Sequence, residues 1–346
     1  MIEIAGRKIG PGQPPYIIAE MSGNHNGELE RALALVEAAA EAGADAVKLQ
    51  TYTADTMTID HHGKEFRIEG GLWDGKTLYE LYEWAHTPWE WHEALFARGR
   101  KLGLAVFSSP FDATAVDFLE GLDAPAYKIA SFEAIDLPLI EKVAATGKPM
   151  IISTGMANLE EIGEAMETAR KHGSGEIVLL HCTSGYPTPA AESNLHTLPD
   201  LAERFGALGG LSDHTLGPEA PIAAVALGAH VIEKHFTLRR ADGGPDAAFS
   251  LEPQELRQLC ESCRTTWQAL GQVDYTRKPS EEGNAAFRRS LYIVEDIAAG
   301  APFTGKNLRA IRPGFGLAPK HLKELLGRTA KEDIKRGTPM SWELVG

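Results

Sequence analysis

Residues 149–184, PMIISTGMANLEEIGEAMETARKHGSGEIVLLHCTS, contain a pattern that recurs along most of the chain. A short apolar run rich in β-branched residues (149–155) precedes an amphipathic stretch with apolar residues at helical spacing (158–173). A second apolar run (177–184) follows, and the amphipathic stretch ends in Gly173, a common helix stop. The order strand, helix, strand is typical of parallel strands that are buried on both faces.

Eight apolar runs of this kind alternate with helix-like stretches such as 29–43 and 89–103. The runs span residues 16–22, 46–51, 105–110, 126–131, 149–155, 177–184, 208–214 and 231–236. Eight such units over roughly 240 residues match a (β/α)₈ barrel better than an open sheet. We therefore predict an α/β fold, a TIM barrel, over residues 1–270.

The composition changes after the last barrel unit. Residues 271–284, GQVDYTRKPSEEGN, are polar and predict a linker. Residues 285–346 hold short apolar runs separated by turn signals, which predicts a small module of about 60 residues. A module of this size buries little surface alone, so we expect it to lie against a larger surface.

Composition and charge exclude several classes of protein. Hydrophobic residues make up 43% of the 346 residues and charged residues 24%, as in ordered globular proteins. A formal net charge of −14 argues against nucleic-acid or membrane partners. We find no signal peptide, no stretch of about 18 apolar residues and only three cysteines, which favours a cytoplasmic location. Cys260 and Cys263 lie in a helix-like stretch and predict a packed pair rather than a redox or metal site.

Polar side chains end nearly every predicted strand. They include Glu20, Lys48, Gln50, Ser109, Lys128, Ser131, Ser153, Ser212, His214 and His235. Barrel enzymes build their sites at the carboxyl ends of the strands. Eight polar strand ends therefore predict one shared polar pocket.

Two kinds of residue in this set suggest chemistry. His214 and His235 end neighbouring strands, so they either ligate one divalent metal or form ordinary hydrogen bonds under loops. Lys48 and Lys128 lie in apolar strands, where an unpaired charge is costly. They either form salt bridges, hold a phosphate or carboxylate together with the serines, or supply a Schiff-base amine.

Two further features complete the candidate site. Glu20 and Glu133 are candidates for proton transfer or for orienting a water molecule, and each is equally suited to a salt bridge. The segment 70–92 is rich in aromatic residues, which predict a helix packed against the barrel for much of it, and its loop GGLWDG is a candidate for contact with a ligand.

The strand-end motifs resemble, in order, those of the sialic acid synthase family. The matching motifs are IAEMSGNHNG, VKLQT, FSSPF, AYKIAS, STGM, HCTSGYPTP, GLSDHT and VIEKHF. SLYIVEDIAAGAPFT and IRPGFGLAP in the C-terminal module resemble the family's antifreeze-like (SAF) domain. The resemblance implies a metal-dependent barrel that condenses phosphoenolpyruvate with an amino sugar and releases phosphate.

The resemblance also implies roles for individual residues. His214 and His235 match metal ligands, usually for Mn²⁺ or Mg²⁺. Positions that match phosphoenolpyruvate contacts are Lys48, Ser109, Lys128, Ser131, Ser153 and Ser212. Positions that match the surroundings of the sugar and the metal-bound water are Glu20, Gln50, Glu133, Tyr186 and Asp246.

Within the family, the segments QTYTADTMTI, GGLWDGKTLYELYEWAHTPWEWH, KIASFEAIDLPLI and RPGFGLAPKH imply the substrate 2,4-diacetamido-2,4,6-trideoxy-L-altrose. Ser184 replaces an Asn of the N-acetylneuraminate synthases, so the substrate is not inferred from that branch. Synthesis of N-acetylneuraminate or legionaminate remains the alternative. Arg312 resembles an arginine that reaches the partner's active site, which implies a domain-swapped homodimer.

Two other functions are compatible with the sequence. A Schiff-base aldolase barrel would use Lys48 or Lys128, predicting borohydride trapping and indifference to chelators. A sugar- or ice-binding protein would use the C-terminal module alone. The full set of polar strand ends counts against that second reading.

Overall fold

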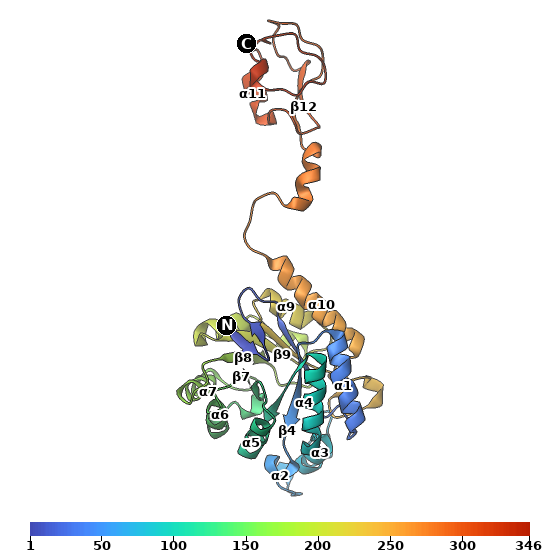
Figure 1. The fold of residues 1–346 in the computed structure, drawn as a ribbon, viewed down its shortest axis with the longest axis vertical. Coiled ribbons are helices and arrows are strands. Elements are labelled where there is room, and N and C mark those ends of the chain that lie inside the picture. The colour runs from blue at the N-terminus through green and yellow to red at the C-terminus, as the bar shows by residue number, and fades with distance from the viewer. The chain divides into compact units, whose positions relative to one another are not determined.

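The computed structural model describes residues 1–346 and divides them into two compact units, Met1–Gly271 and Gln272–Gly346. The first unit is a closed barrel of eight parallel strands in the order β10-β3-β4-β5-β6-β7-β8-β9 (Figure 1). The strands are β3 (Tyr16–Glu20), β4 (Ala46–Thr51), β5 (Ala105–Pro110), β6 (Tyr127–Ile129), β7 (Met150–Ser153), β8 (Ile177–Cys182), β9 (Leu208–Asp213) and β10 (Val231–His235). The predicted TIM barrel is confirmed, and each strand falls within a predicted run.

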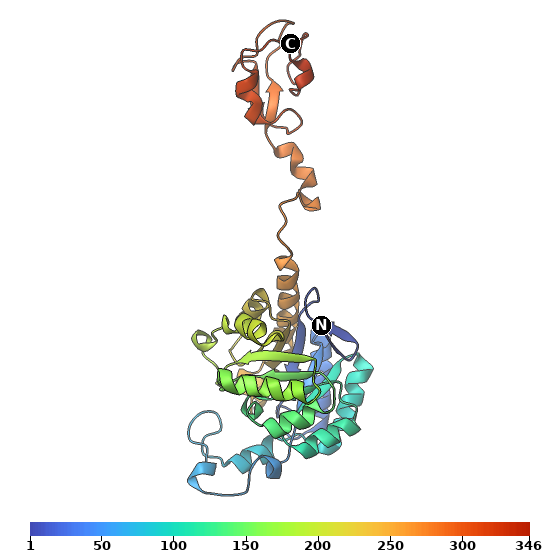
Figure 2. The same cartoon turned by 90° about the vertical axis from the view of Figure 1, so that its left-hand side faces the viewer.

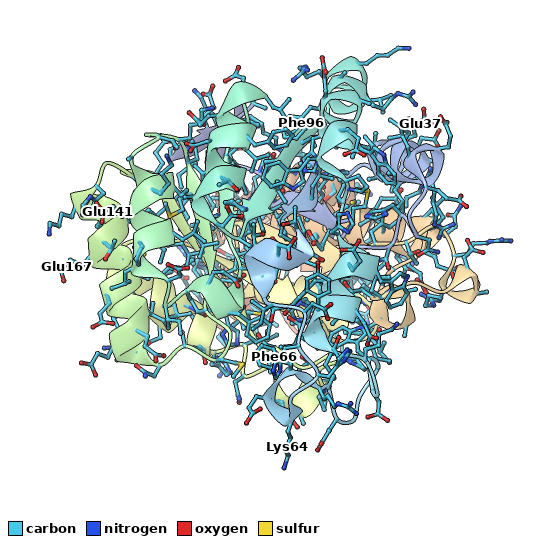
Figure 3. The ribbon with its side chains drawn as sticks, turned by 90° about the horizontal axis from the view of Figure 1, so that it is seen from below. Glu37, Lys64, Phe66, Phe96, Glu141 and Glu167 are labelled. Atoms are coloured by element: carbon cyan, nitrogen blue, oxygen red, sulfur yellow. The ribbon has the colours of Figure 1, made fainter.

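Helices surround the barrel, and in Figure 3, which views the molecule from below, Glu37, Phe96, Glu141 and Glu167 mark α1, α4, α6 and α7. The helices are α1 (Leu29–Ala42), α4 (His92–Leu102), α5 (Ala113–Gly121), α6 (Leu137–Ala144), α7 (Leu159–Lys171), α8 (Thr197–Phe205), α9 (Glu219–Ala226) and α10 (Pro253–Leu270). The start of α7 is set by Asn158, whose side chain accepts from the Glu161 amide while the Glu161 carboxylate accepts from the Asn158 amide. The apolar faces of these helices and the outward side chains of the strands form one large core.

The long connection from β4 to α4 carries α2 (Ala54–Met57) and α3 (Leu78–Ala85). Between these helices the chain forms an extended loop at the end of the barrel, in light blue in Figure 2. The whole connection from β4 to α4 contains the aromatic stretch 70–92, whose last residue begins α4. It therefore supplies side chains to the same end of the barrel as the polar strand ends.

An N-terminal hairpin that the sequence analysis did not predict lies at the opposite end. Strand β1 (Ile2–Ile4) pairs antiparallel with β2 (Arg7–Ile9). Ile2, Ile4 and Ile9 are buried in a second apolar cluster with inward side chains of the barrel strands, such as Ile18 and Phe107. The amino end of the barrel is thus filled and closed by hydrocarbon.

The second unit has a small core of its own. Strands β11 (Ser290–Ile293) and β12 (Leu308–Ile311) pair antiparallel, and α11 (Leu322–Leu325) follows. The buried side chains of this core are Leu291, Ile293, Ile297, Phe303, Leu308, Leu325, Ala330, Ile334 and Met340. A 3₁₀ segment, Pro279–Phe287, overlaps the stretch predicted as a linker.

The structure also describes the cysteine pair and the apolar character of the helices. Cys260 and Cys263 are free and fully buried on α10, and burial raises the pKa of both thiols to about 12, so they are a packed pair. No helix combines the length and the apolar character that crossing a bilayer requires.

Candidate active site

A cavity of about 360 Å³ opens at the carboxyl end of the barrel. Its polar lining comes from strand ends and the loops after them, namely Ser22, Gln50, Ser131, Glu133, Ser184, Tyr186, His235 and Asp246. Its apolar lining includes Met57, Leu81, Ala85, Phe111 and Phe132. The structure therefore brings seven of the predicted site residues to one cavity.

Two lysines and two glutamates form a buried cluster under this cavity. Sheet register places Glu20 beside Lys48, and Lys48 Nζ lies 2.7 Å from Glu20 Oε2. Glu233 Oε1 lies 3.3 Å from Lys128 Nζ and 3.7 Å from Lys48 Nζ. All four residues are at most 4% exposed. The two cations are thus held next to each other by carboxylates, because an isolated buried charge would be unstable.

The charge state of the cluster follows from these contacts. Burial opposes the charge on Lys48, but Glu20 and Glu233 together raise its pKa above the usual value. Burial likewise works against ionised Glu233, yet Lys128 and Lys48 hold the pKa of that carboxyl below its usual range. Burial lowers the pKa of Lys128, and Glu233 offsets this only in part. Ionised Glu233 therefore favours the ammonium form of Lys48 and partly offsets the effect of burial on Lys128.

Hydroxyl groups line the same region. Lys48 Nζ donates to Ser109 Oγ over 3.3 Å, and Ser212 Oγ donates to Glu233 Oε1 over 3.2 Å. Ser153 Oγ is buried and has no hydrogen-bond partner in the protein. Because unpaired buried hydroxyl groups are costly, we infer that a ligand supplies the missing hydrogen-bond partner of Ser153.

Gly155 brings two further serines close to the backbone. A Cβ atom at this position would lie 2.3 Å from Ser184 Oγ and 2.7 Å from Ser131 Oγ. A larger residue would displace both hydroxyl groups, so glycine allows the two serines to lie against the backbone.

The two predicted metal-ligand histidines lie side by side. His214 follows β9 and His235 ends β10, and their ring centroids are 5.3 Å apart. His214 Nδ1 lies 3.0 Å from the carbonyl of Thr183, so it carries the proton and leaves the Nε2 lone pair free. His235 Nδ1 is buried with no hydrogen-bond partner, 3.6 Å from Asp246 Oδ2. Burial lowers the pKa of His235 well below its usual value and keeps the ring neutral.

Burial opposes the charge on His214, but contacts with Cys182 and the Thr183 carbonyl raise the pKa of this ring above its usual value. Imidazole nitrogens with free lone pairs are the donors that Mn²⁺ and similar divalent ions accept. These residues therefore fit a metal ion. No group of three or more His, Cys, Asp or Glu side chains converges on one point. A metal held by His214 and His235 must complete its coordination with substrate oxygens and water.

Glu133 differs from the other carboxylates. It lines the cavity, and its Oε2 is buried without a hydrogen-bond partner. Burial raises the pKa of Glu133 to about 7. Glu20, in contrast, is occupied by Lys48 and by the amide of Gln50, which donates to its Oε1 over 2.8 Å. Glu133 is thus the cavity carboxyl suited to exchanging a proton near neutral pH.

Aromatic rings form one wall of the cavity. Tyr186 lies between Trp73 and His214, with centroids 5.8 and 4.5 Å away. Trp73 Nε1 donates to the carbonyl of Pro245 over 2.9 Å, which fixes the GGLWDG loop at the cavity edge. Trp73 lines the cavity, so the loop reaches the site, and its contact with a ligand stays a prediction.

Arg312 lies in the other unit. It follows β12 directly and is exposed. The barrel unit alone thus contains every predicted site residue except this one.

A family model described as the NeuB family matches residues 35–275, and a SAF domain model matches residues 288–345. The chain belongs to the NeuB family. The family and the antifreeze-like module predicted from the strand-end motifs are confirmed.

Relatives that match nearly the whole chain show which members of the family it is similar to. The pseudaminic acid synthase of Helicobacter pylori is 46% identical over 330 residues, 95% of this chain and 97% of that protein. The N,N'-diacetyllegionaminic acid synthase of Campylobacter jejuni is 40% identical, over 92% of this chain and 96% of its own length. The crystal structure of the N-acetylneuraminic acid synthetase of Leptospira borgpetersenii, in complex with citrate, superposes with a TM-score of 0.73 at 32% identity. It covers 83% of this chain and 95% of that one.

Three residues at this NeuB family site had no role assigned from the sequence: Ser22, Gly155 and Glu233, of which Glu233 was one of the polar strand ends. A signal for Glu233 was present, because Glu233 and His235 are two positions apart and side chains at that spacing share one face of a strand. Lys234, between them, faces the other way and pairs with Asp213. The convergence of two lysines on Glu233 is a property of the closed barrel.

Proposed function

We propose that the chain condenses phosphoenolpyruvate with 2,4-diacetamido-2,4,6-trideoxy-L-altrose to form pseudaminic acid and phosphate. The observation that carries this proposal is the 46% identity to a pseudaminic acid synthase over 95% of the chain. The identity to the legionaminic acid synthase is lower, at 40%. The residues in and around the cavity also support the proposal, because they suit both phosphoenolpyruvate and the sugar.

Phosphoenolpyruvate brings a phosphate and a carboxylate, and the lysine cluster is suited to both. Lys48 and Lys128 supply positive charge, and Ser153 supplies a hydroxyl group without a partner in the protein. Glu233 keeps the two ammonium groups together until the anion arrives. Charge-assisted hydrogen bonds of this kind fix the substrate in one orientation, so that its carbon 3 faces the sugar aldehyde.

We assign the metal to His214 and His235. Bound there, a divalent ion such as Mn²⁺ or Mg²⁺ polarises the aldehyde of the open-chain sugar as a Lewis acid. The protein's own part is to orient both imidazoles and, by burial, to keep the His235 ring neutral.

Attack by carbon 3 on the aldehyde leaves positive charge at carbon 2 of the former phosphoenolpyruvate. A water molecule then adds to carbon 2, and phosphate departs with its bridging oxygen. Glu133 is the residue we assign to accept the proton of this water, because its pKa of about 7 matches neutral pH and its Oε2 is free. Glu20 holds Lys48 and Gln50 in place.

The apolar side of the cavity favours a deoxy sugar with acetamido groups. Met57, Leu81, Ala85 and Phe111 present hydrocarbon that would bind a C6 methyl and acetamido methyl groups, and would leave a C6 hydroxyl without a partner. This lining supports the 6-deoxy substrate over N-acetylmannosamine.

We also propose a homodimer in which the C-terminal unit of each chain covers the partner's barrel mouth. Residues 272–346 carry thirteen Lys and Arg and nine Asp and Glu, whereas residues 1–271 have a net charge of −18. Phe132, Ile135, Met156 and Leu216, which follow barrel strands, are 56 to 78% exposed. Opposite charge and exposed hydrocarbon both favour association.

The test is phosphate release from phosphoenolpyruvate with three sugars: the altrose derivative, N-acetylmannosamine and the substrate of legionaminate synthases. We expect the altrose derivative to give the highest kcat/KM, at least about tenfold above the others. A higher value with either other sugar overturns the substrate assignment. Borohydride trapping of a lysine adduct, with activity indifferent to chelators, would overturn the reaction in favour of an aldolase.

A further inference from the structure

Ser22 has an unusual backbone conformation at the cavity. It lies two residues after β3 and is 3% exposed. Its φ of +47° is in the left-handed region, which side-chain-bearing residues rarely adopt. The Asn24 amide donates to the Met21 carbonyl over 3.1 Å and closes a tight turn with Ser22 inside it. Glycine is the residue that such a turn favours, so a serine here needs another reason.

Close packing around Gly23 prevents the turn from moving. A Cβ at Gly23 would lie 2.5 Å from Pro245 Cγ and 2.8 Å from the Ala85 carbonyl. The chain is therefore held firmly against the loop that carries Asp246. This close approach directs the Ser22 hydroxyl at the Asp246 carboxylate, to which it donates a hydrogen bond.

The hydrogen-bond partners of Ser22 form a chain with a defined direction. Ser22 has one hydroxyl proton, and since it is given to Asp246 Oδ2, its oxygen must accept from Gln50 Nε2, 3.4 Å away. The same Gln50 nitrogen donates to Glu20 Oε1 over 2.8 Å. Both amide protons of Gln50 are then committed to the protein, and its Oε1 remains as an acceptor. Asp246 likewise keeps Oδ1 as an acceptor.

We propose that Ser22 is a positioning residue for the sugar. Its hydroxyl fixes the Asp246 carboxylate and the Gln50 amide so that each presents one acceptor oxygen to the cavity. An acetamido sugar brings N–H and O–H donors that match two such acceptors. The proposal rests on the proposed function for the identity of the ligand, and on the turn geometry for the role of the serine.

Ser22→Gly separates the hydroxyl from the backbone. The variant removes the hydroxyl while giving the turn its preferred residue, so Tm should equal or exceed that of the wild type. We expect kcat/KM for the best sugar of the panel to fall about 10- to 100-fold, the usual cost of losing a hydrogen bond to a charged group. KM for phosphoenolpyruvate should stay within about twofold of the wild type. Ser22→Ala should lose the same activity and have a lower Tm than Ser22→Gly.

Ala5→Gly is the matched control. Ala5 has a φ of +49° in the exposed β1–β2 turn, so glycine relaxes the backbone there without touching the cavity. We expect Tm to be unchanged or higher and turnover to be unchanged.

Full activity of Ser22→Gly would overturn the proposal, because the serine would then have only a backbone role. A wild type inactive with all three sugars would instead refute the proposed function. Crystal structures of the wild type and Ser22→Gly test the positioning without a sugar. Rotation of the Asp246 carboxylate and the Gln50 amide supports the proposal, and unchanged orientations overturn it.

Discussion

The two ends of the barrel are built from the same eight strands and have opposite chemistry. At the amino end, the β1–β2 hairpin and inward side chains such as Ile18 and Phe107 form a closed apolar cluster. At the carboxyl end, Lys48, Lys128 and Glu233 are buried together, and Ser153 and His235 have polar atoms without partners. A chain selected for stability alone would fill both ends with hydrocarbon.

Residues at the amino end stabilise the fold, and residues at the carboxyl end are available for chemistry. Buried charges and unpaired donors destabilise a fold, and they persist where a ligand completes them. Substitutions at the amino end should therefore lower stability while leaving turnover per folded molecule intact. Substitutions at the carboxyl end should do the reverse.

The largest expected effect is at the paired histidines. His235→Ala removes a metal-binding imidazole, so turnover should fall more than about 1,000-fold, in line with the several kcal/mol that a metal supplies to a polarised carbonyl. Bound Mn²⁺ per chain, measured after dialysis, should fall with it. His172→Ala, at the end of the outer helix α7, should change neither. Normal metal content in His235→Ala would contradict the assignment.

Arg312 tests whether the mouth is completed by a second chain. Arg312→Ala should lose about 100- to 1,000-fold in turnover, because a charged contact to substrate is removed. Mixing this variant with inactive His235→Ala under subunit exchange should restore activity, since one site of each hybrid dimer holds both intact residues. Hybrid dimers that form and stay inactive would refute the arrangement.

Glu133 gives the pH dependence. With a folded-state pKa of about 7, its carboxyl is protonated below that pH and unable to accept a proton. The kcat/KM of the wild type should rise with pH up to about 7 and then level off. Glu133→Gln should lose about 100-fold and lack this limb. Glu167→Gln, on the outer surface of α7, should retain the wild-type profile; an unchanged profile in Glu133→Gln would point to another base.

The smallest effect on activity is expected at the amino end. Ile18→Ala leaves a cavity in the apolar cluster and should lower the free energy of unfolding by about 2–4 kcal/mol. The kcat per folded molecule should stay within about twofold of the wild type. Denaturant unfolding and active-site titration measure the two quantities separately. A parallel loss of kcat would show that the two ends are not independent.

Much of this contrast was readable from the sequence. Parallel strands buried on both faces leave continuous apolar runs, and their polar ends gave the barrel and most site residues, including Lys48, Lys128 and both histidines. The hairpin was missed although IEI and RKI alternate around a turn, because three-residue strands carry little signal. The role of Glu233 depends on side chains from two distant strands, and the left-handed conformation of Ser22 depends on packing around Gly23. Neither is encoded in local spacing.

We propose that the charged end of the barrel joins carbon 3 of phosphoenolpyruvate to the sugar while water adds at carbon 2. A single turnover in H₂¹⁸O tests it directly, with the released phosphate analysed by mass spectrometry. Phosphate that leaves from carbon 2 carries the bridging oxygen of phosphoenolpyruvate, so we predict that it contains no solvent ¹⁸O. Phosphate with one ¹⁸O atom would show that water attacks phosphorus, and would contradict the roles given to Glu133 and the lysine cluster.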